Sequence, residues 1–475
     1  MRTLAATLDA AAEAFVAGRL DEAAALYRRA ERQAPDDVRA AYSLAVIDLR
    51  RNQLLSAQER LESVVAREPG LFPAWHNLAA ASQQLRRWNR AAEAYRQALK
   101  LQPDAAESRH GLATALAALG RFDEALDHHR RLAAQPATRW RALTRIALLD
   151  AGAIDEAEFI AMRAAAGAPG ADAETRIGLW FALGEALDAR GRDDEAFVAF
   201  AEGNRLKRAS LGPTVEAAHR AHAAAVDAVR ARDTATALSA DAGRWRAGAA
   251  PIFVVGFPRS GSTLIEQILA SLPGVQGLGE TGAVSDLAAE VGRAPPRKLA
   301  ARYLDALRAA GWDGVSRVVD KTLENYLHVG AIVRMFPDAV ILHAVRDPID
   351  TGYAAFRQLF ASGNETLYGL ADIAAEYRRY RAMMARWASV LPGRVSDISY
   401  EALVAEPEPQ IRRLVVEAAG LPWDQAALRF FEREGAVATA SATQVRRPIY
   451  ATSVQRWRRH EAALKPLIDG LTGPD

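Results

Sequence analysis

The sequence predicts two structural classes in one chain, an array of α-helical hairpins followed by an α/β domain with a parallel sheet. The first prediction rests on positions that recur every 34 residues, beginning with Pro35, Pro69 and Pro103. The second rests on short apolar runs, typical of buried strands, that alternate with helical patterns after residue 250. The 475 residues are 50% hydrophobic and 25% charged, which is the composition of a globular protein with two or more domains.

The composition argues against several classes of protein. The absence of cysteine excludes disulfides, thiolate metal sites and thiol catalysis, and it fits a cytoplasmic location. A net charge of +2 argues against nucleic acid as the main partner. Asp9 and Glu13 interrupt the apolar positions at the N-terminus, so we expect no signal peptide, and no apolar run has the length of a membrane span.

Further sets of residues keep the 34-residue step of the first half. They are Leu20, Leu54, Trp88 and Phe122; Ala23, Ala57, Ala91 and Ala125; and Leu44, Leu78 and Leu112. Small alanine side chains allow two helices to pack closely, and Gly18, Asn52, Arg86 and Gly120 fall where the helices of each pair should turn. After Gly152 the period slips, and a last hairpin follows around residue 191.

This pattern resembles the tetratricopeptide repeat, which implies a solenoid over residues 1–208. Such arrays bind an extended peptide or a partner protein in their groove, and a rigid handle or a self-association surface is the alternative. Residues 209–249 are rich in Ala and Arg and predict a helical linker, with a loop that ends near Gly248. Within the linker, His219 and His222 have helical spacing; with no acids clustered beside them, we expect packed or solvated histidines rather than a metal site.

The second half opens with a strand, a glycine-rich turn and a helix. The apolar run Ile252 to Val255 predicts a buried strand, and helical apolar spacing resumes at Leu264. The amides at the start of such a helix point at an anion. The turn has the spacing of a Walker loop, but a serine stands in the place of its lysine. We therefore predict a phosphate-binding loop for a less charged group, made by Arg259, Ser260, Gly261, Ser262 and Thr263.

The segment FVVGFPRSGSTLIEQIL resembles the 5′-phosphosulfate loop of sulfotransferases, which use 3′-phosphoadenosine 5′-phosphosulfate (PAPS). The likeness covers residues 251–457 and is greatest to tyrosylprotein sulfotransferases and their bacterial relatives with tetratricopeptide repeats. It implies that residues 250–475 form a sulfotransferase fold, a P-loop-like α/β domain with a parallel sheet. It also implies PAPS as co-substrate, adenosine 3′,5′-bisphosphate as product, and no metal.

Polar motifs follow the predicted strands, so we expect them at one edge of the sheet. The apolar residues before Glu280 predict a short strand, and two more strands run into Lys321 and Arg346. Only five of the 60 basic residues are lysine, which makes Lys321 a candidate for chemistry, because an ammonium can neutralise a leaving oxygen.

The resemblance assigns a role to each of these three residues. It implies that Glu280 is the general base, Lys321 the catalytic lysine and Arg346 the ligand of the 3′-phosphate. Each residue also has a structural alternative. Glu280 would be an acid at a helix start. Lys321 would pair with Asp320 or Glu324, and Arg346 with Asp347 or Asp350.

The last motifs lie near the C-terminus. The segment around Tyr400 resembles one that contacts the nucleotide in the family, and SATQVRRPIYATSVQRW resembles the C-terminal PAPS-binding stretch. The resemblance implies that Ser441 stabilises the transition state and Arg456 binds phosphate. The intervening loop is predicted to lie across the ligand through Gln444, Val445, Arg446 and Arg447. Two departures, Ala354 for a serine and Gln358 for an arginine, remove or replace anion contacts of the family.

Together these patterns predict a PAPS-dependent sulfotransferase that moves a sulfuryl group in line to an acceptor hydroxyl. Glu280 would take the proton, while Lys321 and Ser441 steady the leaving oxygens. The resemblance implies a peptide tyrosine as acceptor, with glycans, lipids and small phenols left open. Phosphoryl transfer is a second hypothesis, opposed by Ser262. A nucleotide-binding scaffold that has lost turnover, acting through the repeat groove, is a third.

Overall fold

The computed structural model describes residues 3–241, 250–361, 363–439 and 441–473. The chain divides into two compact units, Met1–Arg139 and Trp140–Asp475. The first unit is built from helices, and the second combines further helices with the parallel sheet.

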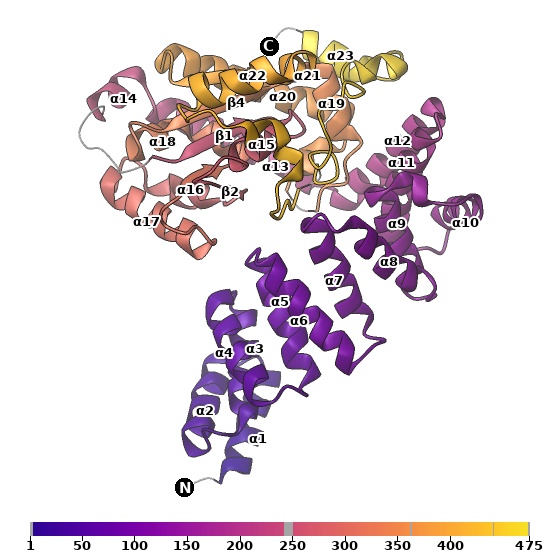
Figure 1. Ribbon diagram of the computed structural model, residues 1–475, viewed down its shortest axis with the longest axis vertical. Helices are drawn as coiled ribbons and strands as arrows, with labels where there is room; N and C mark the ends of the chain where they lie inside the picture. The colour runs from indigo at the N-terminus through magenta and orange to yellow at the C-terminus, as the bar shows by residue number, and fades with distance from the viewer. Residues whose placement is uncertain (1–2, 242–249, 362, 440, 474–475) are drawn as a thin grey trace. The chain divides into compact units, whose positions relative to one another are not determined.

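In the first unit, helices follow one another as hairpins (Figure 1). They are α1 (Leu4–Val16) with α2 (Leu20–Gln33), α3 (Val38–Arg50) with α4 (Leu54–Arg67), α5 (Phe72–Gln84) with α6 (Trp88–Leu101), and α7 (Ala106–Ala118) with α8 (Phe122–Ala133). These helices all start in step with the 34-residue period, and all but α8, which ends two residues early at Ala133, also stop in step with it.

The turns and contacts inside these hairpins confirm the repeat prediction. Gly18, Asn52, Arg86 and Gly120 all have a positive φ, between 56° and 79°, as a tight turn between two helices requires. The four alanines of the 34-residue series, at positions 23, 57, 91 and 125, are completely buried. Small residues therefore stand where paired helices approach each other most closely.

The hairpins continue into the second unit with α9 (Arg139–Leu149), α10 (Glu156–Gly167), α11 (Ala173–Ala189) and α12 (Asp193–Leu211). The short 3₁₀ helix η1 (Ala151–Ala153) stands between α9 and α10, where the sequence period slips. The compact division falls at Arg139–Trp140 rather than at residue 208, because the last hairpin packs on the α/β domain. Asn204 Nδ2 donates to the Phe356 carbonyl at 2.7 Å, and the Phe197 and Phe356 rings are 5.7 Å apart.

Gly184→Ala is expected to lower the free energy of unfolding by about 1–3 kcal/mol. A Cβ at this position of α11 would lie 2.5 Å from the buried Phe200 ring of α12. Chemical denaturation would measure the loss. Gly167→Ala is the matched control, because its Cβ would meet no described atom within 4 Å. Equal losses in both variants would contradict close packing at Gly184 as the cause.

The described residues of the second unit form a five-stranded sheet in the order β2-β3-β1-β4-β5, with all neighbouring pairs parallel. The strands are β1 (Ile252–Gly256), β2 (Val275–Gly279), β3 (Arg317–Asp320), β4 (Val340–Val345) and β5 (Val395–Ser399). The predicted parallel sheet is confirmed. The edge strand β5 has weak apolar character and was missing from the sequence prediction.

Both faces of the sheet are covered, which explains the continuous apolar runs. On one face, Ile252 and Val254 join a core cluster with α15 (Ser262–Ala270). On the other face, the Phe253 ring lies 5.7 Å from Tyr303 and 6.3 Å from Phe336. Central β1 therefore buries alternate side chains in two separate layers.

The remaining α-helices of this unit are α13 (Thr214–Arg232), α14 (Ala235–Asp241), α16 (Ala283–Leu287), α17 (Pro296–Ala309), α18 (Val329–Met335), α19 (Pro348–Phe356), α20 (Leu370–Val390), α21 (Tyr400–Ala405), α22 (Pro407–Arg412) and α23 (Lys465–Thr472). The 3₁₀ helix η3 (Leu323–His328) leads into α18. Among the helices formed by the described residues, none combines the length and apolar character needed to cross a bilayer.

Helix α13, which we predicted as a linker, packs against α20. His219 Nδ1 lies 2.5 Å from Glu376 Oε1, and His222 contacts the other oxygen of the same carboxylate. His222 Nε2 also lies 2.6 Å from the Tyr326 hydroxyl. The two histidines are packed, as expected, but their acid comes from a distant helix. The predicted loop end near Gly248 lies outside the described residues.

His328 makes the stability of this unit sensitive to acid. Burial, with repulsion from Arg232, lowers the pKa of His328 to about 4. An unfolded chain takes up this proton near pH 6.5, so the stabilising contribution is complete above that pH and is lost as the pH falls toward 4. The loss is expected to reach about 3 kcal/mol. Denaturant unfolding at neutral and acid pH should show a smaller loss in His328→Gln; an unchanged loss would contradict this assignment.

Candidate functional site

The predicted site residues lie where the strands end. Each strand of the sheet is followed directly by one of them or by the phosphate loop: β2 by Glu280, β3 by Lys321, β1 by the loop 257–261, β4 by Arg346 and β5 by Tyr400. Because all five strands are parallel, their carboxyl ends meet at one edge of the sheet, where α/β proteins bind ligands. The tertiary structure therefore gathers motifs that are up to 143 residues apart in the chain.

The loop between β1 and α15 has the backbone of an anion cradle. Arg259 and Gly261 have φ angles of 70° and 96°, and the first turn of α15 follows at once. The Ser260 side chain is buried, and its Oγ has no hydrogen-bond partner among the described residues. A buried hydroxyl at a helix start, beside backbone amides that point outward, matches the oxygen atoms of a phosphate.

Tyr400 and Arg346 cover this loop. A Cβ on Gly261 would lie 2.7 Å from Cδ2 of Tyr400, so only glycine lets the ring approach this closely. The guanidinium carbon of Arg346 lies 4.9 Å from the centre of the same ring, a cation–π contact. Arg346 also donates to the carbonyls of Arg259, at 3.1 Å, and Ser453, at 2.6 Å. Arg346 thus links the loop to the C-terminal segment.

Arg259 is held by neutral partners. Its guanidinium donates to Ser441 Oγ at 2.5 Å and to Gln444 Oε1 at 3.2 Å. Burial and the like charge of Arg346 lower the pKa of Arg259 to about 10, so it stays charged at neutral pH. Within the described part of the chain, no carboxylate forms an ion pair with Arg259 or Arg346. The two cations therefore suit an anionic ligand, and the residues fit the phosphate groups of PAPS.

The C-terminal residues divide into two groups. Ser441, Gln444 and Arg447 line a small pocket with Gly261, Thr263 and Tyr400 beside the loop. Val445 also lines this pocket, and its side chain is buried in the apolar core. Arg446 instead donates to the backbone carbonyls of Arg433, at 2.9 Å, and Gly435, and Arg456 forms an ion pair with Asp188 of α11. Both guanidinium groups thus have partners in the structure, backbone oxygens for Arg446 and a carboxylate for Arg456, and their roles toward the nucleotide stay predictions.

Lys321 and Glu280 form a close pair at the ends of β3 and β2. Lys321 Nζ lies 2.5 Å from Glu280 Oε1, and the lysine side chain is only 1% exposed. The glutamate side chain is 49% exposed, so the pair joins a buried cation to an acid that opens to solvent. Asp320, one alternative partner of the lysine, accepts bonds from hydroxyl groups instead.

The sequence prediction missed two acidic features of this region. Glu266 of α15 is buried, and its Oε1 accepts the Gly279 amide at 2.7 Å; burial raises the pKa of this carboxyl. An acid inside the apolar segment LIEQIL was the available signal. The second is Glu185 of α11, whose carboxylate lies 2.8 Å from Arg357, the C-cap residue of helix α19. That contact spans 172 residues, so no local pattern could reveal it.

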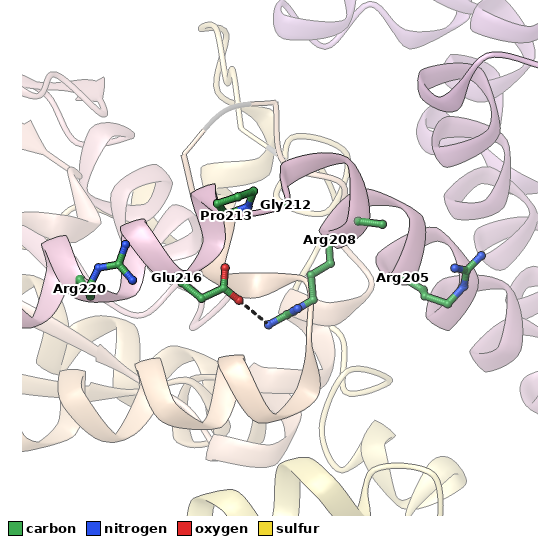
Figure 2. Close-up of a pocket in the computed structure, with 7 residues that line it drawn as sticks. Arg205, Arg208, Gly212, Pro213, Glu216 and Arg220 are labelled. Carbon is green, nitrogen blue, oxygen red and sulfur yellow. Dashed lines mark ion pairs between the residues drawn. The ribbon is translucent and has the colours of Figure 1, made fainter.

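A separate surface pocket lies at the turn between α12 and α13 (Figure 2). Figure 2 shows Arg208 directed toward Glu216. The two charged groups lie 3.5 Å apart. Arg208 also lies 2.7 Å from Asp372, and Arg205 lies 2.7 Å from Glu202. Since acids neutralise these arginines and none of the lining residues lies at a strand end, this pocket is not part of the candidate site.

Comparison with known proteins agrees with a repeat array followed by an α/β domain. Residues 251–310 and 286–425 match the model of the sulfotransferase family. Residues 14–81 and 72–105 match models of the tetratricopeptide repeat. A protein of Aquifex aeolicus (strain VF5), named only as uncharacterized, is 30% identical over 382 residues, which are 75% of this chain and 49% of that protein. This chain therefore spans about half the length of that relative.

Among solved structures, the sulfotransferase domain from the curacin biosynthetic pathway is 17% identical, with a TM-score of 0.36, over 45% of this chain and 92% of that one. YrrB, described as a TPR protein with an unusual peptide-binding site, is 17% identical, with a TM-score of 0.31, over 42% of this chain and 91% of that one. Because both TM-scores are below 0.5, we draw no conclusion about the fold or function of this chain from either likeness. On its sequence motifs, family matches and parallel sheet, the chain carries tetratricopeptide repeats followed by a sulfotransferase-family α/β domain.

Proposed function

We propose that this protein is a PAPS-dependent sulfotransferase that transfers a sulfuryl group to an acceptor hydroxyl, with a peptide tyrosine as the acceptor. The contact between Lys321 and Glu280 carries the proposal, because it joins a buried cation and an accessible base. Sulfuryl transfer needs both: one group takes the acceptor proton, and the other neutralises the leaving oxygen.

In the proposed reaction, the acceptor oxygen forms a bond to sulfur while the bond between sulfur and the 5′-phosphate oxygen breaks. The hydroxyl proton moves to the Glu280 carboxylate, and the electron pair of the broken bond leaves with adenosine 3′,5′-bisphosphate. Lys321 stabilises the negative charge that develops on the departing oxygen. Ser441, which accepts from Arg259, would support the same phosphate.

Nucleotide binding would use the phosphate loop at one end and Arg346 at the other. Ser260, Gly261, Ser262 and Thr263 would hold the 5′-phosphosulfate at the start of α15. Arg346 would hold the 3′-phosphate from the end of β4. The family arginine replaced by Gln358 is not restored by its neighbour Arg357, because Glu185 and Asp188 already neutralise that side chain. We therefore propose that fewer charges bind the nucleotide here than in the family pattern.

The repeats of residues 14–105 would bind the peptide that carries the acceptor tyrosine. Tetratricopeptide arrays bind extended peptides in their grooves, which agrees with a peptide acceptor. Under this proposal, removing the first hairpins would raise the KM for a peptide but leave that for a small phenol unchanged.

The decisive experiment combines binding with transfer. Calorimetry would compare adenosine 3′,5′-bisphosphate with ATP, without metal. Mass spectrometry would then search for sulfate-sized additions in a cell extract incubated with the protein and PAPS. Binding and transfer together support the proposal, and binding without transfer in any extract, peptide or phenol would favour a nucleotide-binding scaffold. Preference for ATP with magnesium would favour phosphoryl transfer instead.

A further inference from the structure

Glu280 occupies a loop whose backbone direction is tightly set. It lies between Gly279 and Gly282, which have φ angles of 67° and 71°. The pairing of β2 with β3 also shifts register between Gly277 and Gly279. An irregularity of this kind re-aims the side chains that follow it. The direction of Glu280 therefore depends on how this loop is fastened.

The fastening comes from the residues on either side of Lys321. The Thr281 hydroxyl donates to Asp320 Oδ2 at 2.8 Å, and the Thr281 amide donates to Thr322 Oγ1 at 2.9 Å. The Thr322 hydroxyl in turn donates to Asp320 Oδ1 at 2.6 Å. These bonds close a ring that joins the residue after Glu280 to both neighbours of Lys321.

On the other side of Glu280, both backbone polar groups of Gly279 are also hydrogen-bonded. The Gly279 carbonyl accepts the Lys321 amide at 2.9 Å, and the Gly279 amide donates to Glu266 Oε1 at 2.7 Å. Glu266 belongs to α15, the helix that starts at the phosphate loop. The loop of Glu280 is thus fastened both to the strand end that carries Lys321 and to the phosphate-loop helix.

Asp320 is the centre of the ring and is fully buried. A buried carboxylate is costly unless donors surround it, and here Tyr303 supplies a further hydroxyl at 2.9 Å. None of these bonds reaches Lys321 Nζ, which is left free to contact Glu280. Asp320 therefore stands beside Lys321 in the chain but fastens the loop of Glu280, not the lysine side chain.

We propose that Thr281 and Asp320 are positioning residues for the general base, holding Glu280 against Lys321 through the Thr281 hydroxyl. The inference rests on the proposed sulfotransferase function and adds to it the part of the fold that sets the base in place. Displacement of a reacting group by about 1 Å can cost about 10²-fold in rate. Loss of the hydroxyl should therefore lower kcat while leaving the KM for PAPS unchanged.

The test compares Thr281→Val with Thr281→Ser in the full chain at neutral pH, with PAPS as donor and both a tyrosine-containing peptide and unsubstituted phenol as acceptors, because both acceptors are protonated there. Valine keeps the shape of threonine without the hydroxyl, whereas serine keeps the hydroxyl. The expected result is a kcat lowered by about 10–10²-fold in Thr281→Val and near wild type in Thr281→Ser. Thr472→Val is the matched control, because it removes a threonine hydroxyl that donates only to backbone carbonyls of its own helix α23, and its kcat should stay near wild type.

Each other outcome has a defined meaning. An unchanged kcat in Thr281→Val, or equal losses with valine and serine, would overturn the inference while leaving the proposed function intact. A wild type that transfers no sulfate would overturn the proposed function, and this inference with it. Affinity for adenosine 3′,5′-bisphosphate reports whether Thr281→Val is folded; if it is not, Thr281→Ala replaces it, with the same expected results.

Discussion

Lys321→Ala is expected to lower kcat for sulfuryl transfer by about 10²–10³-fold, the usual cost of removing one group that stabilises transition-state charge. Lys321 is almost completely buried, so water cannot replace its ammonium beside the leaving oxygen. Affinity for adenosine 3′,5′-bisphosphate should change little, because the phosphate loop and Arg346 remain. Steady-state kinetics with labelled PAPS, together with calorimetry, would separate the two effects.

Two further variants sharpen this prediction. Lys321→Met keeps the length of the side chain without its charge and should be as inactive as the alanine variant. Lys298→Ala removes an exposed lysine from α17 and should keep wild-type kinetics. An active Lys321→Met variant would show that the site needs the volume of this side chain rather than its charge.

Glu280→Gln is expected to lower kcat by about 10²–10⁴-fold, the usual contribution of a positioned general base. The amide keeps the size of the side chain and an oxygen for Lys321, but it cannot take a proton. With a phenolic acceptor, the loss should shrink as the pH approaches the phenol pKa, near 10 for tyrosine, because a phenolate needs no base. The rate of each enzyme, measured against pH, tests this directly.

The control for the base is Glu324→Gln, which removes a nearby acid that makes no contact with Lys321 in the described structure. Its kcat should stay close to that of the wild type. If the Glu280→Gln rate were lowered by the same factor at every pH, the glutamate would act through charge or positioning rather than by taking a proton.

Much of the fold could be read from the sequence because its signals are local. The 34-residue period predicted the hairpins of the first unit, and it also predicted the turns at Asn52 and Arg86, where neither residue is glycine. The run Ile252 to Val255 and the helix after it specified the strand, loop and start of α15. These features depend on neighbours within a few turns of the chain, so their residue patterns suffice.

Long-range partners were beyond such patterns. Arg456, which is predicted to bind phosphate, pairs in the structure with Asp188, 268 residues earlier. Likewise, Glu376 reaches His219 and His222 from another helix, and Glu266 reaches the loop of the proposed base. A charged side chain pairs with whichever opposite group the fold brings near, and chain spacing does not determine that group.

The sequence by itself determined the order of the parts and the chemical types at each strand end: the phosphate loop, Glu280, Lys321 and Arg346. Only the tertiary structure decided that Lys321 contacts Glu280 rather than Asp320, and that the last hairpin packs with the α/β domain. The physical reason is that the periodicity of a helix or a strand depends on residues that are close together in the chain. The choice among possible partners for a buried charge is made instead by burial and by the register of the folded sheet.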